Sequence, residues 1–226
     1  DDIEKHVAFL GLGRRPDGSY WEDDNYALRV TEPGSTIKLV TLMAILEKGT
    51  SKLDDLVEVG SAGHMIVGPR NVNDAERSPK PVLTVKECFA HSSNVGMSKL
   101  ALKAFSQNPK EFREYLHKYH MDVTVPVDLS NIPKPRLAPL EKNSGGLMNM
   151  ITMSFGYALQ VSPLHTLALY NAIANNGVMV KPYLVSSIRQ DGIIVKQFDP
   201  TVLDESITKP EVVKAARQSM EAVISE

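Results

Sequence analysis

The sequence is short of cysteine, tryptophan and long apolar runs, and it has no excess of charge of one sign. One cysteine among 226 residues excludes an intramolecular disulfide and a cysteine-rich metal site. No segment approaches the ~18 uninterrupted apolar residues that span a bilayer. The 25 basic and 27 acidic residues nearly balance, without a run of five like charges, so we expect no nucleic-acid partner.

The remaining composition is that of an ordinary globular chain. Hydrophobic residues make up 42% and charged residues 23%, and the length suits one large domain or one and a half. The first residues have none of the character of a signal peptide. Either the protein is soluble, therefore, or its membrane anchor lies outside this chain.

The first strong helix signal covers residues 35–48. Apolar residues occupy most of its circumference, and Gly49 is a natural stop, so the pattern predicts a helix in the middle of the protein. Further helices are predicted over 84–91, from 94 to about 105, over 109–119, over 162–175 and from 210 onward.

The segments between these helices differ in character. Asp191-Gly192 lies between two apolar runs and predicts a hairpin, and a turn at 15–18 suggests another. Residues 50–81 are polar and turn-rich, which predicts irregular structure. Residues 122–149 contain many prolines and glycines and are expected to form a long, functional loop.

Ser35 and Lys38 stand three residues apart at the start of the predicted central helix. That spacing places them on one helical face, where a lysine whose pKa is lowered by burial could take the serine proton. About one such pair is expected by chance, and Ser206 with Lys209 is a second, although Pro210 should keep that pair off a shared helical turn. The alternative for Ser35 is a helix cap with Lys38 in solvent.

Ser92 and Asn94 lie in a short connection between two predicted helices. A hydroxyl and an amide held there could relay a proton and bind a substrate amide. The alternative is that Ser93 or Asn94 only caps the following helix. Residues 106–108 repeat the pattern, but a helix end followed by a helix start explains them.

Other candidates favour structural roles. His117 and His120 share a helix face without a carboxylate cluster, which favours an exposed pair over a metal site. Cys88 is expected to be a small buried hydrophobe rather than a nucleophile. Trp21 is expected to pack in the ordinary way.

Three segments together resemble the transpeptidase domain of penicillin-binding proteins: EPGSTIK at 32–38, HSSNVGMSKL at 91–100 and SFGYALQVSPL at 154–164. The resemblance runs from about residue 15 to beyond 182 and is greatest to class B, division-type enzymes. It implies an α+β fold of the penicillin-binding and serine β-lactamase type, in which an antiparallel sheet packs with helices. The helical lobe would cover about residues 35–175 of one domain, 1–226.

The resemblance also implies roles for four residues. Ser35 would attack a D-Ala-D-Ala stem peptide, Lys38 would accept its proton, Ser92 would pass a proton to the departing D-Ala, and Asn94 would bind the peptide amide. It implies neither a cofactor nor a metal. The expected partners are peptidoglycan stem peptides, β-lactams and membrane proteins of the division complex, on the extracytoplasmic (periplasmic) face of the membrane.

The sequence departs from the family in its third motif. In the family this motif is Lys-Thr-Gly or Lys-Ser-Gly, and it binds the substrate carboxylate and contributes to the oxyanion hole. This sequence contains neither form. In relatives this motif follows a helix like the one from residue 210. We therefore expect a domain truncated at its C-terminus, without its last strands and final helix, and impaired or inactive in isolation.

Two other functions use the same fold. A serine β-lactamase would hydrolyse its acyl-enzyme and turn over, whereas a transpeptidase stays acylated by β-lactams. A non-catalytic β-lactam sensor, or a scaffold that docks division proteins, would bind its partners unchanged after Ser35→Ala.

Overall fold

The computed structural model describes residues 12–14, 16–18, 20–22, 27–129, 132–142 and 145–225. Its helices are η1 (Gly34–Ile37), α2 (Lys38–Lys48), α3 (Val85–Ala90), α4 (Asn94–Phe105), α5 (Lys110–Lys118), α6 (Gly146–Met153), α7 (Pro163–Ala174) and α8 (Pro210–Ser225). None of these helices is long and apolar enough to cross a membrane.

The strands are short. They are β1 (Leu12–Arg14), β2 (Tyr20–Glu22), β3 (Leu56–Glu58), β4 (His64–Val67), β5 (Arg70–Asn73), β6 (Val82–Thr84), β7 (Arg136–Leu137), β8 (Leu159–Gln160), β9 (Met179–Val180), β10 (Ser187–Gln190), β11 (Ile193–Gln197) and β12 (Val202–Asp204). Within the described residues they pair two by two, always antiparallel. Helices and antiparallel strands together give the expected α+β architecture.

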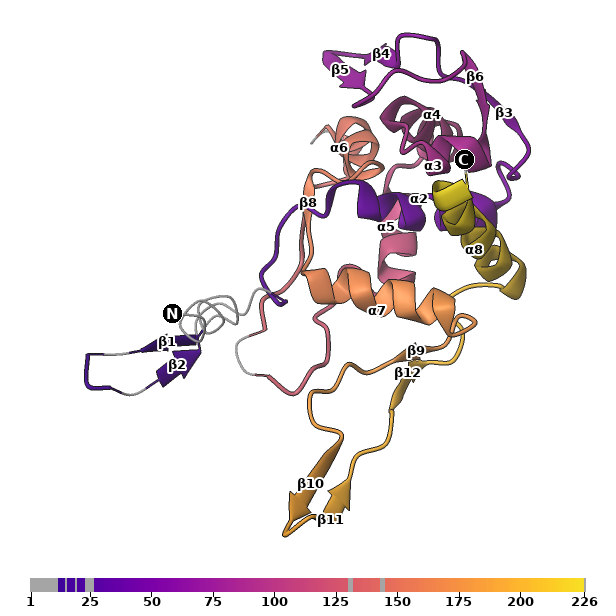
Figure 1. The fold of residues 1–226 in the computed structure, drawn as a ribbon. Helices are drawn as coiled ribbons and strands as arrows, with labels where there is room; N and C mark the ends of the chain where they lie inside the picture. The colour runs from indigo at the N-terminus through magenta and orange to yellow at the C-terminus, as the bar shows by residue number, and fades with distance from the viewer. Residues whose placement is uncertain are drawn as a thin grey trace.

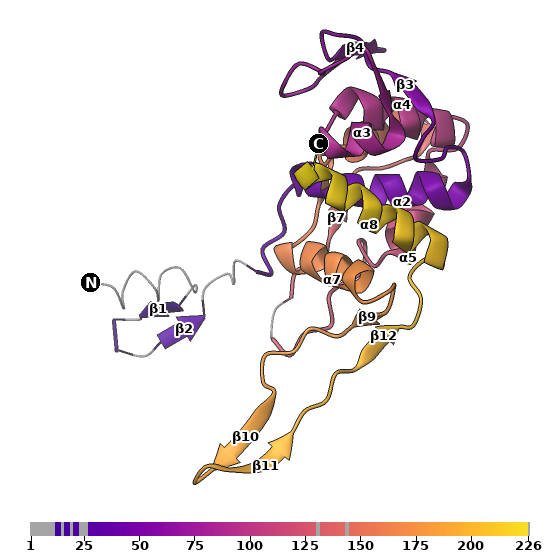
Figure 2. The ribbon, with the colours of Figure 1, turned by 45° about the vertical axis from the view of Figure 1, so that its right-hand side comes forward.

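Helix α2 is the centre of the body, as its apolar circumference predicts. Residues 38–45 are all buried, and α3, α4, α5 and α8 contact the helix. Figures 1 and 2 show α2 crossing the middle of the molecule beside α8, which comes from the other end of the chain. The helix ends at Gly49, whose φ of 75° is in the left-handed region. Glycine adopts this conformation readily, whereas a residue with a side chain is disfavoured there.

The prediction of irregular structure over 50–81 is wrong. Strand β3 pairs with β6, and β4 forms a hairpin with β5 around Gly68. Val57 and Leu83 face each other across the first ladder and are buried, whereas Leu56, Glu58 and Val82 beside them are exposed. Runs of three or four residues are too short for alternation to stand out among polar neighbours.

The long loop predicted over 122–149 also needs correction, because it contains β7 and the start of α6. A Cβ at Gly146, the first residue of α6, would lie 2.2 Å from the carbonyl oxygen of Leu140. Helix α6 therefore begins where the backbone of the preceding loop passes closely, and this contact has no signal in local periodicity.

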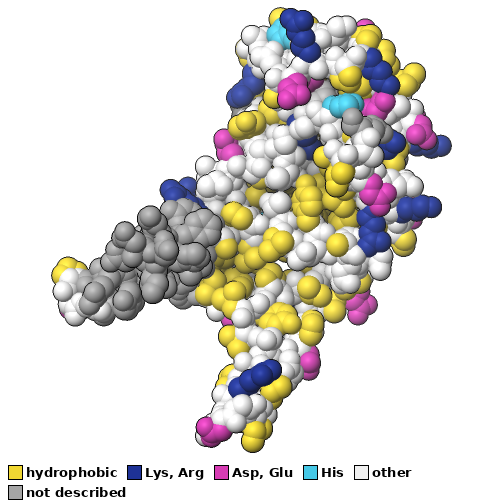
Figure 3. All heavy atoms as spheres, viewed as in Figure 1, with side chains coloured by type: hydrophobic (Ala, Val, Ile, Leu, Met, Phe, Trp, Pro, Cys, Tyr) yellow, Lys and Arg dark blue, Asp and Glu magenta, His cyan; other side chains and the backbone are white. Residues whose placement is uncertain are grey.

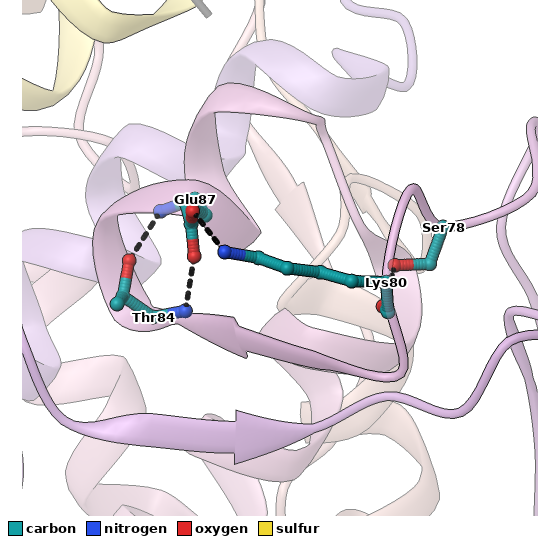
Figure 4. A network of polar contacts seen from close by, with 4 residues as sticks. All are labelled: Ser78, Lys80, Thr84 and Glu87. Atoms are coloured by element: carbon teal, nitrogen blue, oxygen red, sulfur yellow. Dashed lines mark hydrogen bonds and ion pairs between the residues drawn. The ribbon is translucent and has the colours of Figure 1, made fainter.

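The capping box predicted for α3 is present (Figure 4). The Thr84 hydroxyl accepts from the backbone N–H of Glu87 at 3.1 Å, and the Glu87 carboxylate accepts from the N–H of Thr84 at 2.7 Å. Lys80 pairs with the same carboxylate at 2.6 Å, and Ser78 donates to the carbonyl of Lys80. The start of α3 thus holds the loop that precedes it.

Residues 181–201 form an arm that projects from the body and carries the hairpin β10–β11, as the Asp191-Gly192 signal predicts (Figure 1). Strands β9 and β12 pair at its base. Hydrophobic side chains are visible along the arm and where it joins the body (Figure 3). Those exposed on the arm include Tyr183, Leu184, Val185, Ile188, Ile193, Ile194 and Val195.

Near the C-terminal end of α2, Glu47 joins segments that are distant in sequence. Its carboxylate accepts hydrogen bonds from the hydroxyls of Tyr119 (2.7 Å) and Thr208 (2.8 Å), and it pairs with Lys118. Burial alone would raise the pKa of Glu47, but the hydrogen bonds from these three donors outweigh it and lower that pKa.

We expect Glu47→Ala to destabilise the fold by about 2–4 kcal/mol at pH 7, because the buried hydroxyls of Tyr119 and Thr208 lose their acceptor. Since the folded pKa of Glu47 is lowered, its contribution is present above the unfolded pKa of about 4.3 and is lost as pH falls through the folded value. Denaturant unfolding from pH 3 to 7 measures both effects. The control Glu47→Gln should remain folded with a flatter pH profile, and a wild-type-like profile would contradict the assignment.

Candidate functional site

Ser35 lies in the 3-10 turn η1, and Lys38 is the first residue of α2. The helix predicted from residue 35 therefore begins with a tighter turn, but the two side chains still meet: Lys38 Nζ lies 3.2 Å from Ser35 Oγ. The capping alternative for Ser35 is wrong, because Pro33 is the cap residue of η1. Ser35 is exposed, so a molecule in the solvent can reach its hydroxyl.

The Lys38 side chain is 1% exposed, which overturns the alternative of a solvated lysine. Its amino group donates to Ser35 Oγ, to Ser92 Oγ at 2.8 Å and to the Ser92 carbonyl oxygen at 2.5 Å. Burial lowers the pKa of Lys38 to about 8, against an opposing effect of Asp74. The neutral amine, which can accept a proton, is therefore accessible near neutral pH.

The turn at 92–94 divides its side chains between two roles. Ser93 caps α4, accepting from the N–H of Gly96 at 2.8 Å, so the capping alternative holds for Ser93. Ser92 instead faces Lys38, with φ 52°. Asn94 donates from its amide to the carbonyl of Asn73 at 2.7 Å.

A cleft of about 510 Å³ opens beside these residues. Ser35 and the turn at 92–94 form part of its wall, and the loop at 74–79 forms another part. The Ser78–Glu87 network of Figure 4 holds the far end of that loop. The structure thus brings all four predicted site residues to one place, three of them on the cleft and Lys38 buried behind them.

The segment SFGYALQVSPL at 154–164 contacts the residues at the start of η1 and in α2. The N–H of Gly34 donates to the carbonyl of Gly156 at 3.1 Å, and the Thr41 hydroxyl donates to the Ser154 carbonyl at 2.9 Å. A Cβ at Gly156 would lie 1.9 Å from the carbonyl oxygen of Gly34. Only glycine allows this approach, so Gly156 positions the residue that precedes Ser35.

The other sequence candidates are not among the residues that line the cleft. Cys88 is buried, as expected for a small hydrophobe, and burial raises the pKa of its thiol to about 12. His117 and His120 face different aspartates, Asp122 and Asp204.

Two further residues that the sequence analysis singled out are Lys209 and Trp21. Lys209 precedes α8 rather than sharing a turn with Ser206, as Pro210 predicts. The side chain of Trp21 lies outside the described residues. Sequence reasoning missed Asp74 and Gly156, because neither carries a local signal for a contact with the site.

Comparison with known proteins gives a family match over nearly the whole chain. The model of the family described as "Penicillin binding protein transpeptidase domain" matches residues 10–226. Among curated proteins, penicillin-binding protein PbpB of Mycolicibacterium smegmatis is 30% identical over 194 residues, covering 85% of this chain and 28% of that protein. Peptidoglycan D,D-transpeptidase FtsI of Buchnera aphidicola is 29% identical, covering 66% of this chain and 24% of that protein.

A solved structure of a transpeptidase domain has a similar fold. The transpeptidase domain of penicillin-binding protein 3 from Burkholderia pseudomallei superimposes with a TM-score of 0.72 at 26% identity, covering 88% of this chain and 56% of that one. The chain thus spans about a quarter of the length of the two curated relatives.

We expect Gly156→Ala to destabilise the fold by about 3 kcal/mol, because the methyl group meets the Gly34 carbonyl and the positive φ of 108° is strained. The matched control is Gly192→Ala, with φ 79° and open space around its Cβ, which should cost only about 1 kcal/mol. Chemical denaturation measures both. Equal losses of unfolding free energy in the two variants would show that the contact with Gly34 does not contribute to the cost of Gly156→Ala.

Proposed function

The chain belongs to the family of penicillin-binding protein transpeptidase domains, and we propose that it supplies the acyl-transfer site of a peptidoglycan D,D-transpeptidase. The observation that carries the proposal is the buried Lys38 amino group, which lies within hydrogen-bond distance of Ser35 Oγ and Ser92 Oγ. A nucleophile, a base with a lowered pKa and a second hydroxyl are the parts that serine acyl transfer needs.

In the first half-reaction, Ser35 Oγ bonds to the carbonyl carbon of the penultimate D-Ala while neutral Lys38 accepts the serine proton. The tetrahedral intermediate then breaks its C–N bond. The terminal D-Ala leaves as an amine, with a proton returned from Lys38 through Ser92 Oγ. The contacts of Lys38 Nζ with both hydroxyls support this relay without a large movement of any side chain.

In the second half-reaction, an amine of a neighbouring stem peptide attacks the Ser35 ester and loses its proton to the same relay. Ser35 departs with a proton, and the new amide is the cross-link. Asn94, which lines the cleft, would bind the backbone amide of the donor peptide after its contact with Asn73 is exchanged. β-Lactams would acylate Ser35 in place of the stem peptide.

The division-type role is part of the proposal. This role is peptidoglycan synthesis at the septum, on the extracytoplasmic face of the membrane. The relative named peptidoglycan D,D-transpeptidase FtsI supports its peptidoglycan part. The resemblance of the three motif segments to division-type enzymes supports its septal part. Membrane proteins of the division complex would be the partners. The sequence has no Lys-Thr-Gly motif, and losing one oxyanion donor costs a factor of ~10²–10³ in rate, so we expect acylation by this chain to be slow.

Incubation with a penicillin, followed by intact mass measurement, tests the nucleophile. We expect a slowly formed adduct on the wild-type chain and none on Ser35→Ala, whereas Ser206→Ala, at the other Ser-x-x-Lys pair, should still acylate. An adduct that forms on Ser35→Ala would refute the assignment. An adduct that forms and is then hydrolysed rapidly would indicate a β-lactamase.

The lowered pKa of Lys38 predicts the pH dependence of acylation. Because only the neutral amine accepts the Ser35 proton, the rate should rise with pH and level off above about 8. Lys38→Arg keeps the positive charge but cannot lose its proton, so it should abolish acylation at every pH from 6 to 9. A wild-type rate that is independent of pH in this range would exclude Lys38 as the base.

A further inference from the structure

Asp74 is an acidic residue that directly contacts the turn at 92–94. One carboxylate oxygen, Oδ2, accepts from the Ser93 hydroxyl at 2.9 Å, and the other, Oδ1, accepts from the backbone N–H of Val95 at 2.9 Å. Both oxygens are therefore engaged with the residues that follow Ser92. Hydrogen bonds to an ionised carboxylate are about twice as strong as neutral ones, so this clamp is a firm one.

The residue that needs holding is Ser92. Its φ of 52° is in the left-handed region, which costs a residue with a side chain about 1–2 kcal/mol. That conformation lets both the hydroxyl and the carbonyl of Ser92 reach Lys38 Nζ. A strained residue persists where its surroundings over-determine it, and Asp74 supplies such contacts immediately after it.

Asp74 is itself anchored outside the site. Its backbone N–H donates to the carbonyl of Gly63 at 2.8 Å, and it directly follows β5. The preceding residue, Asn73, accepts from the Asn94 amide. The β4–β5 hairpin therefore holds the turn through two successive residues, one by its side chain and one by its backbone.

The charge of Asp74 also reaches the lysine. Burial lowers the pKa of Lys38, and the negative charge of Asp74 acts in the opposite direction. Glu76, Arg77 and His91 are the other charged or titratable groups in the cleft wall. Asp74 differs from them because its carboxylate accepts hydrogen bonds from Ser93 and Val95, next to the residue that contacts Lys38.

We propose that Asp74 is a positioning residue, whose carboxylate clamps Ser93 and Val95 so that Ser92 keeps its hydroxyl and carbonyl on Lys38. The proposal rests on the proposed function, because a clamp on Ser92 matters for acylation only if Ser35, Lys38 and Ser92 perform it. Asp74 touches none of the reacting atoms and acts through the turn.

Asp74→Asn is the test, because it keeps the shape of the side chain and removes its charge. The rate of Ser35 acylation by a penicillin is measured against pH by intact mass. We expect the plateau rate to fall about tenfold or more as Ser92 loses its fixed position. We also expect the midpoint of the profile to move to lower pH, since the charge that raises the pKa of Lys38 is gone. The shift of the midpoint reports the lost charge, whereas the fall of the plateau reports the lost position of Ser92.

Two measurements do not depend on acylation. NMR of labelled lysine gives the pKa of Lys38 directly, and amide hydrogen exchange reports protection of the Val95 N–H. In Asp74→Asn we expect the pKa to fall and the exchange to accelerate. If the wild-type chain does not acylate, the proposed function fails, but exchange of the Val95 N–H still decides whether Asp74 clamps the turn.

Asp128→Asn is the matched control, because it removes an equal charge from an exposed carboxylate that pairs with Lys181. It should leave the rate profile and both NMR readouts unchanged. A wild-type profile and wild-type exchange in Asp74→Asn would overturn the proposal. If Asp74→Asn does not fold, Ser93→Ala replaces it: the plateau should fall with the midpoint unchanged, and an unchanged plateau would overturn the proposal.

Discussion

The structure depends on the enclosure of one amino group. Lys38 carries its charge or its lone pair at the edge of the hydrophobic core, where an unpaired ammonium would be very costly. Oxygens of Ser35 and Ser92 surround it, and Ser92 lies 54 residues from Lys38 along the chain. The central position of α2, the turn after α3 and the strained backbone at Ser92 all serve to bring these oxygens to one point.

Elements with a strong local pattern could be predicted from the sequence. The apolar circumference of α2, the capping box of α3 at Thr84 and the Asp191-Gly192 hairpin are each encoded within a few residues. Strands of three or four residues and the start of α6 at Gly146 could not, because pairing or a close backbone approach from elsewhere determines them. These elements contain too few residues for a periodic pattern of apolar side chains to identify them.

The same division applies to the site. Ser35 and Lys38 are three residues apart, so their contact follows from helical geometry. The partnership of Lys38 with Ser92 was implied by a family resemblance, and their spacing alone does not predict it. Asp74 and Gly156 are common residue types that act through contacts with residues distant in sequence, so only the folded chain reveals them. The sequence thus predicts the proposed nucleophile and base better than the residues that hold them in place.

The cluster around Glu47 has a consequence for the order of folding. Its donors Lys118, Tyr119 and Thr208 lie 71, 72 and 161 residues further along the chain. Contacts of such sequence separation are slow to form, because a large loop must close first. A chain emerging from the ribosome therefore completes α2 long before Thr208 exists. Lys118 and Tyr119 can bind the Glu47 carboxylate before that point, and Thr208 joins them only after most of the chain has been made.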